Sequence, residues 1–252
     1  MRDVDQSTWF PLQLLKLALE ASGAKIELQA SRDVMVQSRS LKELERNQDE
    51  LHIAWSMTSV QREQSLLPIR IPIFKGLYGW RLLLIRQGQQ AAWRGVRSLA
   101  DLSSFSLIQG HDWPDTEILR ANGLQVGTAP TFASLFSMLK AGRAQGFPRS
   151  VLEIAWEQAS QSQHFAIEQD LVLHYPTAVY FFVRPSDHRL ASLVELGLNR
   201  LLAQGVFDRL FTKAHEPAIR AAALRKRHVI ELHNPLLPEQ TPLQRQELWR
   251  LP

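Results

Sequence analysis

Hydrophobic and polar positions follow two periods in the first quarter of the chain. Residues 11–23, PLQLLKLALEASG, carry leucines on more than one face, and their Pro and Gly suit the first turn and the end of a helix. Residues 25–31, KIELQAS, alternate apolar with polar side chains, which predicts a strand. A short polar helix over 40–48 and a strand over 50–57 follow. This order of helices and strands is typical of a parallel sheet.

A second α/β series follows an extended Pro-containing stretch and a strong strand at 80–87. Its helices carry Thr, Pro or Gly signals at their ends, and its strands are short and apolar. Pro148, Arg149 and Ser150 stand between a strand and a helix, and we expect them to open that helix. The predicted elements are strands 105–110, 125–130 and 144–147 and helices 114–123, 131–142 and 149–159.

The last third begins with two strand-like segments, 164–176 and 178–186. The most strongly amphipathic helix of the chain follows, with Asp187 near its start and Gly205 after its end. A shorter helix, a short strand and a Pro-rich tail complete the sequence. Two α/β series joined by a long extended connection predict an α/β protein with two lobes.

Composition excludes several classes of protein. The 252 residues carry a formal net charge of +4, and their basic residues are scattered, so we expect no nucleic acid partner. The absence of cysteine excludes disulfides and thiol catalysis. There is no run of about 18 apolar residues, so we expect no membrane span. The N-terminus is polar and unlike a signal peptide, so an exported form would have lost its signal.

The usual catalytic signatures are absent. We find no GxSxG, HExxH, Walker or GxGxxG motif, and the eight histidines show no metal-ligand spacing. We therefore expect no enzyme, no cofactor and no metal site. Carboxylates such as Asp112 and Asp115 suit the start of a helix, where the dipole favours negative charge.

Several stretches, in their order along the chain, carry a resemblance to a known family. They are MTSVQRE (57–63), LLIRQG (83–88), DLSSFSLIQGHDWPDTEIL (101–119), PTFASLFSMLKAGRAQGF (130–147) and AVYFFVRPSDHRLASLVELGLNRLLAQGVFDRLF (178–211). From about residue 10 to residue 213 the chain resembles a divergent member of the extracellular solute-binding protein family 3, the type II periplasmic binding proteins. No single motif is diagnostic, and the order of the stretches carries the resemblance.

The resemblance implies an α/β fold of two lobes, each a mixed sheet flanked by helices, that clamp a small polar solute by hinge closure. It also implies a periplasmic location and a membrane permease or a sensor as partner. On this basis we expect lobe one to comprise 1–82 and 184–252, lobe two to comprise 83–183, and hinges to lie near 76–86 and 178–186.

In lobe one, the resemblance implies that Arg62 binds a ligand carboxylate, with Thr58 and Ser59 as donors beside it. A guanidinium suits this role because its geometry matches a carboxylate bidentately. The sequence leaves open whether Arg62 instead pairs with an acid such as Glu63. Trp55, near a predicted strand end, is a candidate for stacking on the ligand.

In lobe two, His111, Asp112 and Trp113 follow a predicted strand and precede a helix, where main-chain N–H groups favour an anion or form an ordinary capped turn. Amino-acid binders of the family place an Asp for the ligand ammonium after a later strand of lobe two, predicted here at 144–147, and this chain has Pro148, Arg149 and Ser150 there. A cation at that place repels an ammonium group, which favours an anionic solute unless Arg149 turns away.

The leading hypothesis is a non-catalytic binding protein for a small polar, anionic or amino-acid-like solute. One alternative is an envelope protein-interaction subunit, suggested by the long tail NPLLPEQTPLQRQELW at 234–249. Another is a lyase, such as a dehydratase, on the same fold. A lyase needs a general base, and Glu153 or Glu157 is the nearest candidate.

Overall fold

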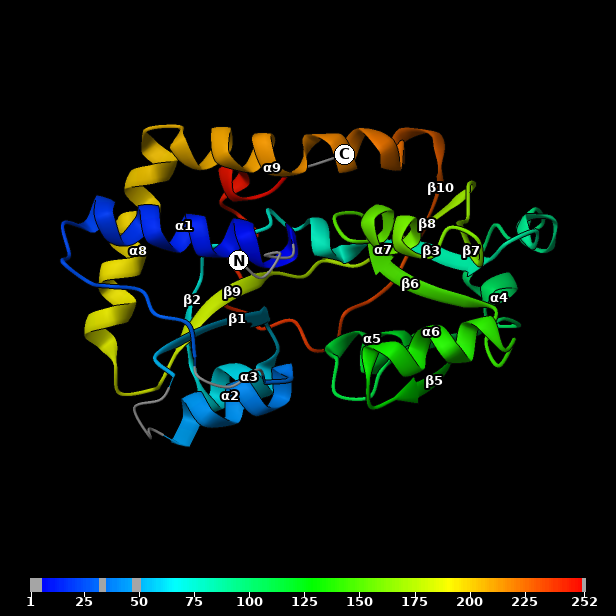
Figure 1. The fold of residues 1–252 in the computed structure, drawn as a ribbon, viewed down its shortest axis with the longest axis horizontal. Coiled ribbons are helices and arrows are strands. Elements are labelled where there is room, and N and C mark those ends of the chain that lie inside the picture. Colours follow the sequence, from blue (N-terminus) through cyan, green and yellow to red (C-terminus); the bar gives the residue numbers. More distant parts are fainter. Residues whose placement is uncertain (1–5, 32–34, 47–50, 251–252) are drawn as a thin grey trace. The chain divides into compact units, whose positions relative to one another are not determined.

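The chain forms two compact units in the computed structural model, which describes residues 6–31, 35–46 and 51–250 (Figure 1). Unit 1 consists of 1–75, 178–216 and 238–249. Unit 2 consists of 76–177, 217–237 and 250–252. Within the described ranges, no helix has both the length and the apolar character needed to span a membrane.

The unit boundaries differ from the lobes expected from the sequence. Unit 2 begins at Gly76 instead of residue 83, because the strand at 80–86 pairs with strands of unit 2 along its whole length. Residues 217–237, expected in lobe one, belong to unit 2, where the strand at 228–231 pairs with the strand at 171–174.

Unit 1 is built around a sheet of order β1-β9-β2, in which β9 pairs antiparallel with both neighbours. The parallel sheet expected from the first elements is therefore wrong, because the neighbour of β1 comes from far along the chain. The elements of unit 1 are α1 (Gln6–Ser22), α2 (Gln37–Arg46), β1 (Ile53–Met57), α3 (Val60–Ser65), β2 (Leu67–Ile69), β9 (Val179–Val183), α8 (His188–Ala203), the first part of α9 (Val206–Ala222) and the 3-10 helix η4 (Gln246–Leu248).

Two packing arrangements hold unit 1 together. Helix α1 packs against α8 so closely that a Cβ on Gly197 would lie 1.8 Å from the carbonyl oxygen of Ala18 (Figure 1). Helix α2 and the sheet share a buried cluster, against which Trp249 of the tail packs. Lys75 Nζ also donates to the Glu247 carbonyl at 2.7 Å. Residues 238–249 of the tail therefore form part of unit 1, whereas 234–237 belong to unit 2.

The strand expected at 25–31 does not form, and Ile26 and Leu28 are 44% and 38% exposed. The alternating pattern is present, but no described strand pairs with the segment, and a strand needs hydrogen-bonded neighbours. Helix α1 also begins earlier than expected, at Gln6, so Pro11 lies inside the helix.

Unit 2 contains a mixed sheet of order β10-β8-β3-β6-β4-β5, with β7 paired to β3. Strand β4 is parallel to β5 and β6, whereas β3 is antiparallel to β6, β7 and β8. Its elements are η1 (Leu77–Gly79), β3 (Trp80–Arg86), η2 (Gln90–Trp93), α4 (Leu99–Leu102), β4 (Ser106–Gly110), α5 (Pro114–Ala121), β5 (Gln125–Ala129), α6 (Phe132–Lys140), β6 (Gly146–Ser150), α7 (Ile154–Ser160), β7 (Phe165–Ile167), β8 (Leu171–His174), the last part of α9, η3 (Leu224–Lys226) and β10 (His228–Glu231).

Pro148, Arg149 and Ser150 belong to β6 and do not open a helix, which corrects the expectation from the sequence. The sheet accepts the proline because of its place in the ladder. Val151 N donates to the Trp80 carbonyl, so the alternation of antiparallel pairs directs the nitrogen of residue 148 away from β3. On its other side, β6 pairs with β4 only at Gly146, so the missing N–H breaks no ladder bond.

Candidate functional site

Arg62 of unit 1 lies on α3, just beyond the carboxyl end of β1. Its Nη1 donates to Ser56 Oγ at 2.6 Å and to the Met57 carbonyl at 2.8 Å, and its Nη2 donates to Gln37 Oε1 at 3.0 Å. These three acceptors are neutral oxygens from β1 and α2. They hold the guanidinium in one direction at the end of β1.

Thr58 and Ser59 form the turn between β1 and α3. Ser59 Oγ accepts from Arg62 N at 3.2 Å and caps α3, and Thr58 Oγ1 donates to Glu63 Oε1 at 2.5 Å. Glu63 in turn pairs with Arg70, whose Nε and Nη2 lie 3.0 and 2.5 Å from Oε2. The acid beside Arg62 in the sequence is thus bound by Arg70 and Thr58.

Trp55 does not join this group. It precedes Ser56 in β1, where it pairs with Phe181, and neighbouring residues of a strand point to opposite faces of the sheet. Ser56 contacts Arg62, so Trp55 lies on the other face. The structure brings Thr58, Ser59 and Arg62 together and separates Trp55 from them.

The candidate residues of unit 2 lie where β4, β5 and β6 end. These strands run parallel, so their carboxyl ends meet at one edge of the sheet, which is where open α/β sheets bind ligands. His111 is exposed, with Nδ1 3.9 Å from Asp112 Oδ1. Trp113 folds back over Gly110, where a Cβ would lie 2.5 Å from the indole ring. Glycine is therefore required at position 110 for this approach.

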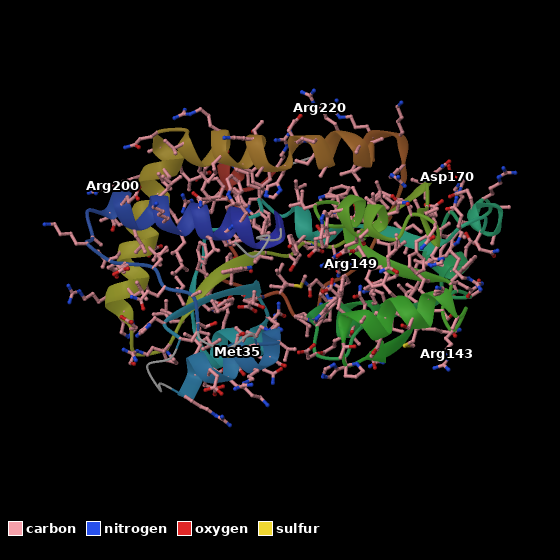
Figure 2. All side chains as sticks on the ribbon, in the orientation of Figure 1. Met35, Arg143, Arg149, Asp170, Arg200 and Arg220 are labelled. Carbon is pink, nitrogen blue, oxygen red and sulfur yellow. The ribbon has the colours of Figure 1, made fainter. Side chains whose placement is uncertain are left out.

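Arg149 points into unit 2 and lies against three aromatic rings. Its guanidinium carbon is 4.9, 5.4 and 5.1 Å from the ring centres of Trp113, Phe132 and Phe147, within the range of cation–π interactions. Only 5% of the residue is exposed. Figure 2 shows Arg149 among the side chains within unit 2, whereas Arg143 and Arg220 extend from the surface. We refer to the three rings as the aromatic cage.

Two carboxylates hold Arg149 in the aromatic cage. Its Nε and Nη2 donate to Glu157 Oε2 and Oε1 at 2.8 and 2.6 Å, a bidentate pair, and Nη2 lies 3.1 Å from Glu153 Oε2. Burial alone lowers the pKa of Arg149, but the charges of Glu153 and Glu157 outweigh it and raise that pKa. Arg149 is therefore a neutralised cation and does not repel an ammonium group as the sequence suggested.

Ser150, the next residue, is fully buried. Its Oγ lies 3.4 Å from the Leu77 carbonyl, to which it donates, and accepts from Leu152 N at 3.2 Å. Both partners belong to unit 2. The side chain therefore supports the end of β6 and does not face solvent.

A second buried ion pair adjoins the first. Arg81 Nη2 lies 2.5 Å from Asp115 Oδ1, and Arg81 Nε donates to Tyr175 Oη at 3.0 Å. Tyr175 donates to Asp115 as well. Burial raises the pKa of Tyr175, so it stays a neutral donor. The pair links β3, α5 and the segment after β8.

Glu153 connects the two pairs. It accepts from Tyr78 Oη at 3.1 Å and lies 4.0 Å from Arg81 Nη1 as well as close to Arg149. Burial and the charge of Glu157 raise its pKa, and Arg149 opposes them only in part. The result is a continuous polar network of five charged side chains and two tyrosines inside unit 2.

A groove of about 1040 Å³ lies in unit 1. The end of α1, residues 22–31, the start of β1 and α8 line it, and none of the candidate residues does. No group of three or more His, Asp or Glu side chains among the described residues is placed to hold a metal ion.

Sequence reasoning missed the partners of Arg149. Arg149 lies in β6, whereas Glu157 lies eight residues later in helix α7, and no local sequence pattern links two such positions. The positions of Trp113 and Phe132 were predictable, because each follows one of two neighbouring parallel strands. Aromatic residues after two adjacent strands are expected at the same edge of a sheet.

Comparison with known proteins gives matches in structure alone. No family model matches the sequence, and no curated protein matches it. An ancestral arginine-binding protein bound to arginine has a TM-score of 0.60 and 16% identity, covering 83% of this chain and 90% of that one. The ligand-binding core of GluR0 from Nostoc punctiforme, in complex with L-glutamate, has a TM-score of 0.57 and 16% identity, with 82% and 91% covered.

A third match is a periplasmic His/Glu/Gln/Arg/opine family-binding protein from Silicibacter pomeroyi in complex with lysine. Its TM-score is 0.61 at 10% identity, with 82% of this chain and 86% of that one covered. The chain has the fold of the type II periplasmic binding proteins. This periplasmic-binding-protein fold confirms the α/β class and the mixed, helix-flanked architecture predicted from the sequence. At such low identity, the likeness shows the fold and leaves the ligand open.

Proposed function

We propose that this periplasmic-binding-protein fold serves as a non-catalytic solute-binding protein, and that Arg62 binds a carboxylate of a small polar or amino-acid-like solute. The observation that carries the proposal is the arrangement at the end of β1, where Ser56, Met57 and Gln37 hold the guanidinium in one orientation. A side chain fixed in advance loses little conformational entropy on binding. Thr58 and Ser59 maintain the turn and stay predictions as direct ligand contacts.

The similar proteins support this proposal, because their solved complexes hold arginine, glutamate or lysine. We also propose membership of the family 3 solute-binding proteins, a periplasmic location, and a permease or a sensor as partner. Clamping of the solute by closure of two lobes, with hinges near 76–86 and 178–186, stays a prediction. His111, Asp112 and Trp113 stay predicted contacts as well.

The structure removes the main support for both alternatives. Most of the tail that suggested an interaction subunit, residues 238–249, packs within unit 1, where Leu248 is buried and Trp249 packs against the buried cluster shared by α2 and the sheet. The carboxylates offered as a general base for a lyase are engaged, since Glu157 binds Arg149 and Glu153 accepts from Tyr78.

Calorimetric titration of the purified protein with L-arginine, L-lysine, L-glutamate and dicarboxylates tests the proposal. We expect binding of at least one carboxylate-bearing solute, and Arg62→Ala should weaken it by about 30-fold or more. Arg200→Ala is the matched control, because Arg200 is an exposed arginine of unit 1 that donates to the Ala21 carbonyl. Unchanged affinity in Arg62→Ala would remove Arg62 from the site, and no response to any solute would contradict the proposed function.

A further inference from the structure

The aromatic cage of unit 2 has the composition of a guanidinium receptor. Three aromatic faces surround the cation, and a carboxylate binds it through two parallel N–H···O bonds. This cage stands at the carboxyl ends of β4, β5 and β6, the edge where sheets of this kind bind ligands. The occupant, however, is a side chain of the same chain.

The inner side of the aromatic cage is buried, and its outer wall lies at the surface. Glu157 is 3% exposed and Arg149 is 5% exposed, whereas Phe132, the outer wall, is 42% exposed. Removal of the Arg149 side chain beyond Cβ would therefore leave a polar cavity with one side near the surface. The cavity would retain the three rings and the carboxylates of Glu157 and Glu153 without Arg149 between them.

We propose that the aromatic cage is a guanidinium-binding site whose ligand is Arg149 itself, so that this residue excludes cationic solutes from it. The tethered side chain competes at a high effective concentration, which a free cation in solution does not match. Arg149 is thus a specificity-determining residue that acts by occupancy. The proposal does not depend on whether the protein binds a solute through Arg62.

Arg149→Ala tests the proposal by opening the site. Guanidinium chloride is added at up to about 50 mM, far below denaturing concentrations, and the melting temperature is followed. At ten times its dissociation constant, guanidinium should raise the melting temperature of the variant by about 3–5 °C. The wild type should show no rise. Urea, a planar neutral molecule of similar size, and sodium chloride at equal concentration should stabilise neither protein.

Two further variants identify the groups that bind. Arg149→Ala/Glu157→Gln lacks the bidentate carboxylate and keeps that of Glu153, and Arg149→Ala/Phe132→Ala lacks the outer ring. We expect the first to lose most of the rise, because only Glu153 remains, and the second to weaken guanidinium binding about 3-fold or more, as for one cation–π contact. An equal rise in the wild type or in the Glu157→Gln double variant would place guanidinium elsewhere and overturn the proposal.

Arg149→Ala leaves a buried carboxylate without its partner and can fail to fold. Refolding yield then replaces the melting temperature. Guanidinium at the same concentrations should restore the yield of Arg149→Ala, whereas Arg149→Ala/Glu157→Gln should fold without it. A variant that gains neither yield nor stability from guanidinium, while the double variant folds, contradicts the proposal.

Discussion

Arg62 and Arg149 occupy comparable places in the two units, each at the carboxyl end of a strand, yet their surroundings differ. Three neutral oxygens orient Arg62, which is half-buried. Two carboxylates and three rings enclose Arg149, which is buried. The same residue type is thus half-buried and held by neutral oxygens of β1 and α2 in unit 1, and buried in a bidentate ion pair in unit 2.

The comparison teaches that position at a strand end does not decide whether an arginine binds a solute. The partners decide. Neutral acceptors leave the charge of a guanidinium largely unchanged, whereas a buried bidentate carboxylate removes it from the electrostatics of any ligand. This difference is open to experiment, because it predicts opposite responses of stability and binding in the two units.

Glu157→Gln should give the largest effect. The substitution leaves the charge of Arg149 without its bidentate partner and should lower the free energy of unfolding by about 3–5 kcal/mol. Urea denaturation measures this free energy. Arg62→Ala is the comparison in unit 1, where the loss of hydrogen bonds to neutral acceptors should lower the free energy of unfolding by about 1–2 kcal/mol. Equal losses in the two variants would abolish the distinction between the two arginines.

The pH dependence of stability caused by His215, a residue of unit 1, should be the next largest effect. It lies among Phe10, Phe74 and Phe211, and burial lowers its pKa to about 4. The unfolded chain binds the proton near pH 6.5 and the folded chain does not, so stability is full above pH 6.5 and falls as the pH drops toward 4. The loss amounts to at most about 3 kcal/mol.

His215→Leu should flatten the stability of the protein between pH 6.5 and 4, measured by urea denaturation at a series of pH values. His111→Leu is the matched control, because it makes the same substitution at an exposed histidine. A slope that survives in His215→Leu would assign the acid sensitivity to another group.

Glu153 should give the smallest effect, with the opposite sign, in unit 2. Its folded-state pKa is raised, so its contribution to stability is present at pH values below the unfolded pKa and is lost as the pH rises through the folded one. Glu153→Gln keeps the neutral shape and should remove this loss, as judged from the same pH series. A stability of Glu153→Gln that falls with rising pH as in the wild type would contradict the assignment.

Elements with complete local signals were predictable from the sequence. The strand expected at 80–87 is β3, the helix expected at 114–123 is α5, and Thr131 caps α6 as its hydroxyl suggested. In each case the apolar period and the end signal agree, so the neighbours along the chain contain the information.

Elements that depend on distant partners were not predictable. Residues 25–31 alternate apolar with polar side chains but form no strand. Strand β6 accepts Pro148 because β4 pairs with β6 only at Gly146. The short helix α3 at Val60–Ser65 was also missed, although Ser59 gives it a cap. The occupied aromatic cage depends on residues from three strand ends and a helix, so only the assembled sheet reveals it.

The place of β9 at the centre of its sheet imposes an order of assembly during synthesis. Strands β1 and β2 both pair with β9 and not with each other, and β9 follows the whole segment 76–177 of unit 2. While the chain is being made, β3 therefore meets β6 and β8 before the first two strands have a partner. Strands β1 and β2 are therefore synthesised first and paired last. Until β9 is made, their unpaired edges can contact other nascent chains.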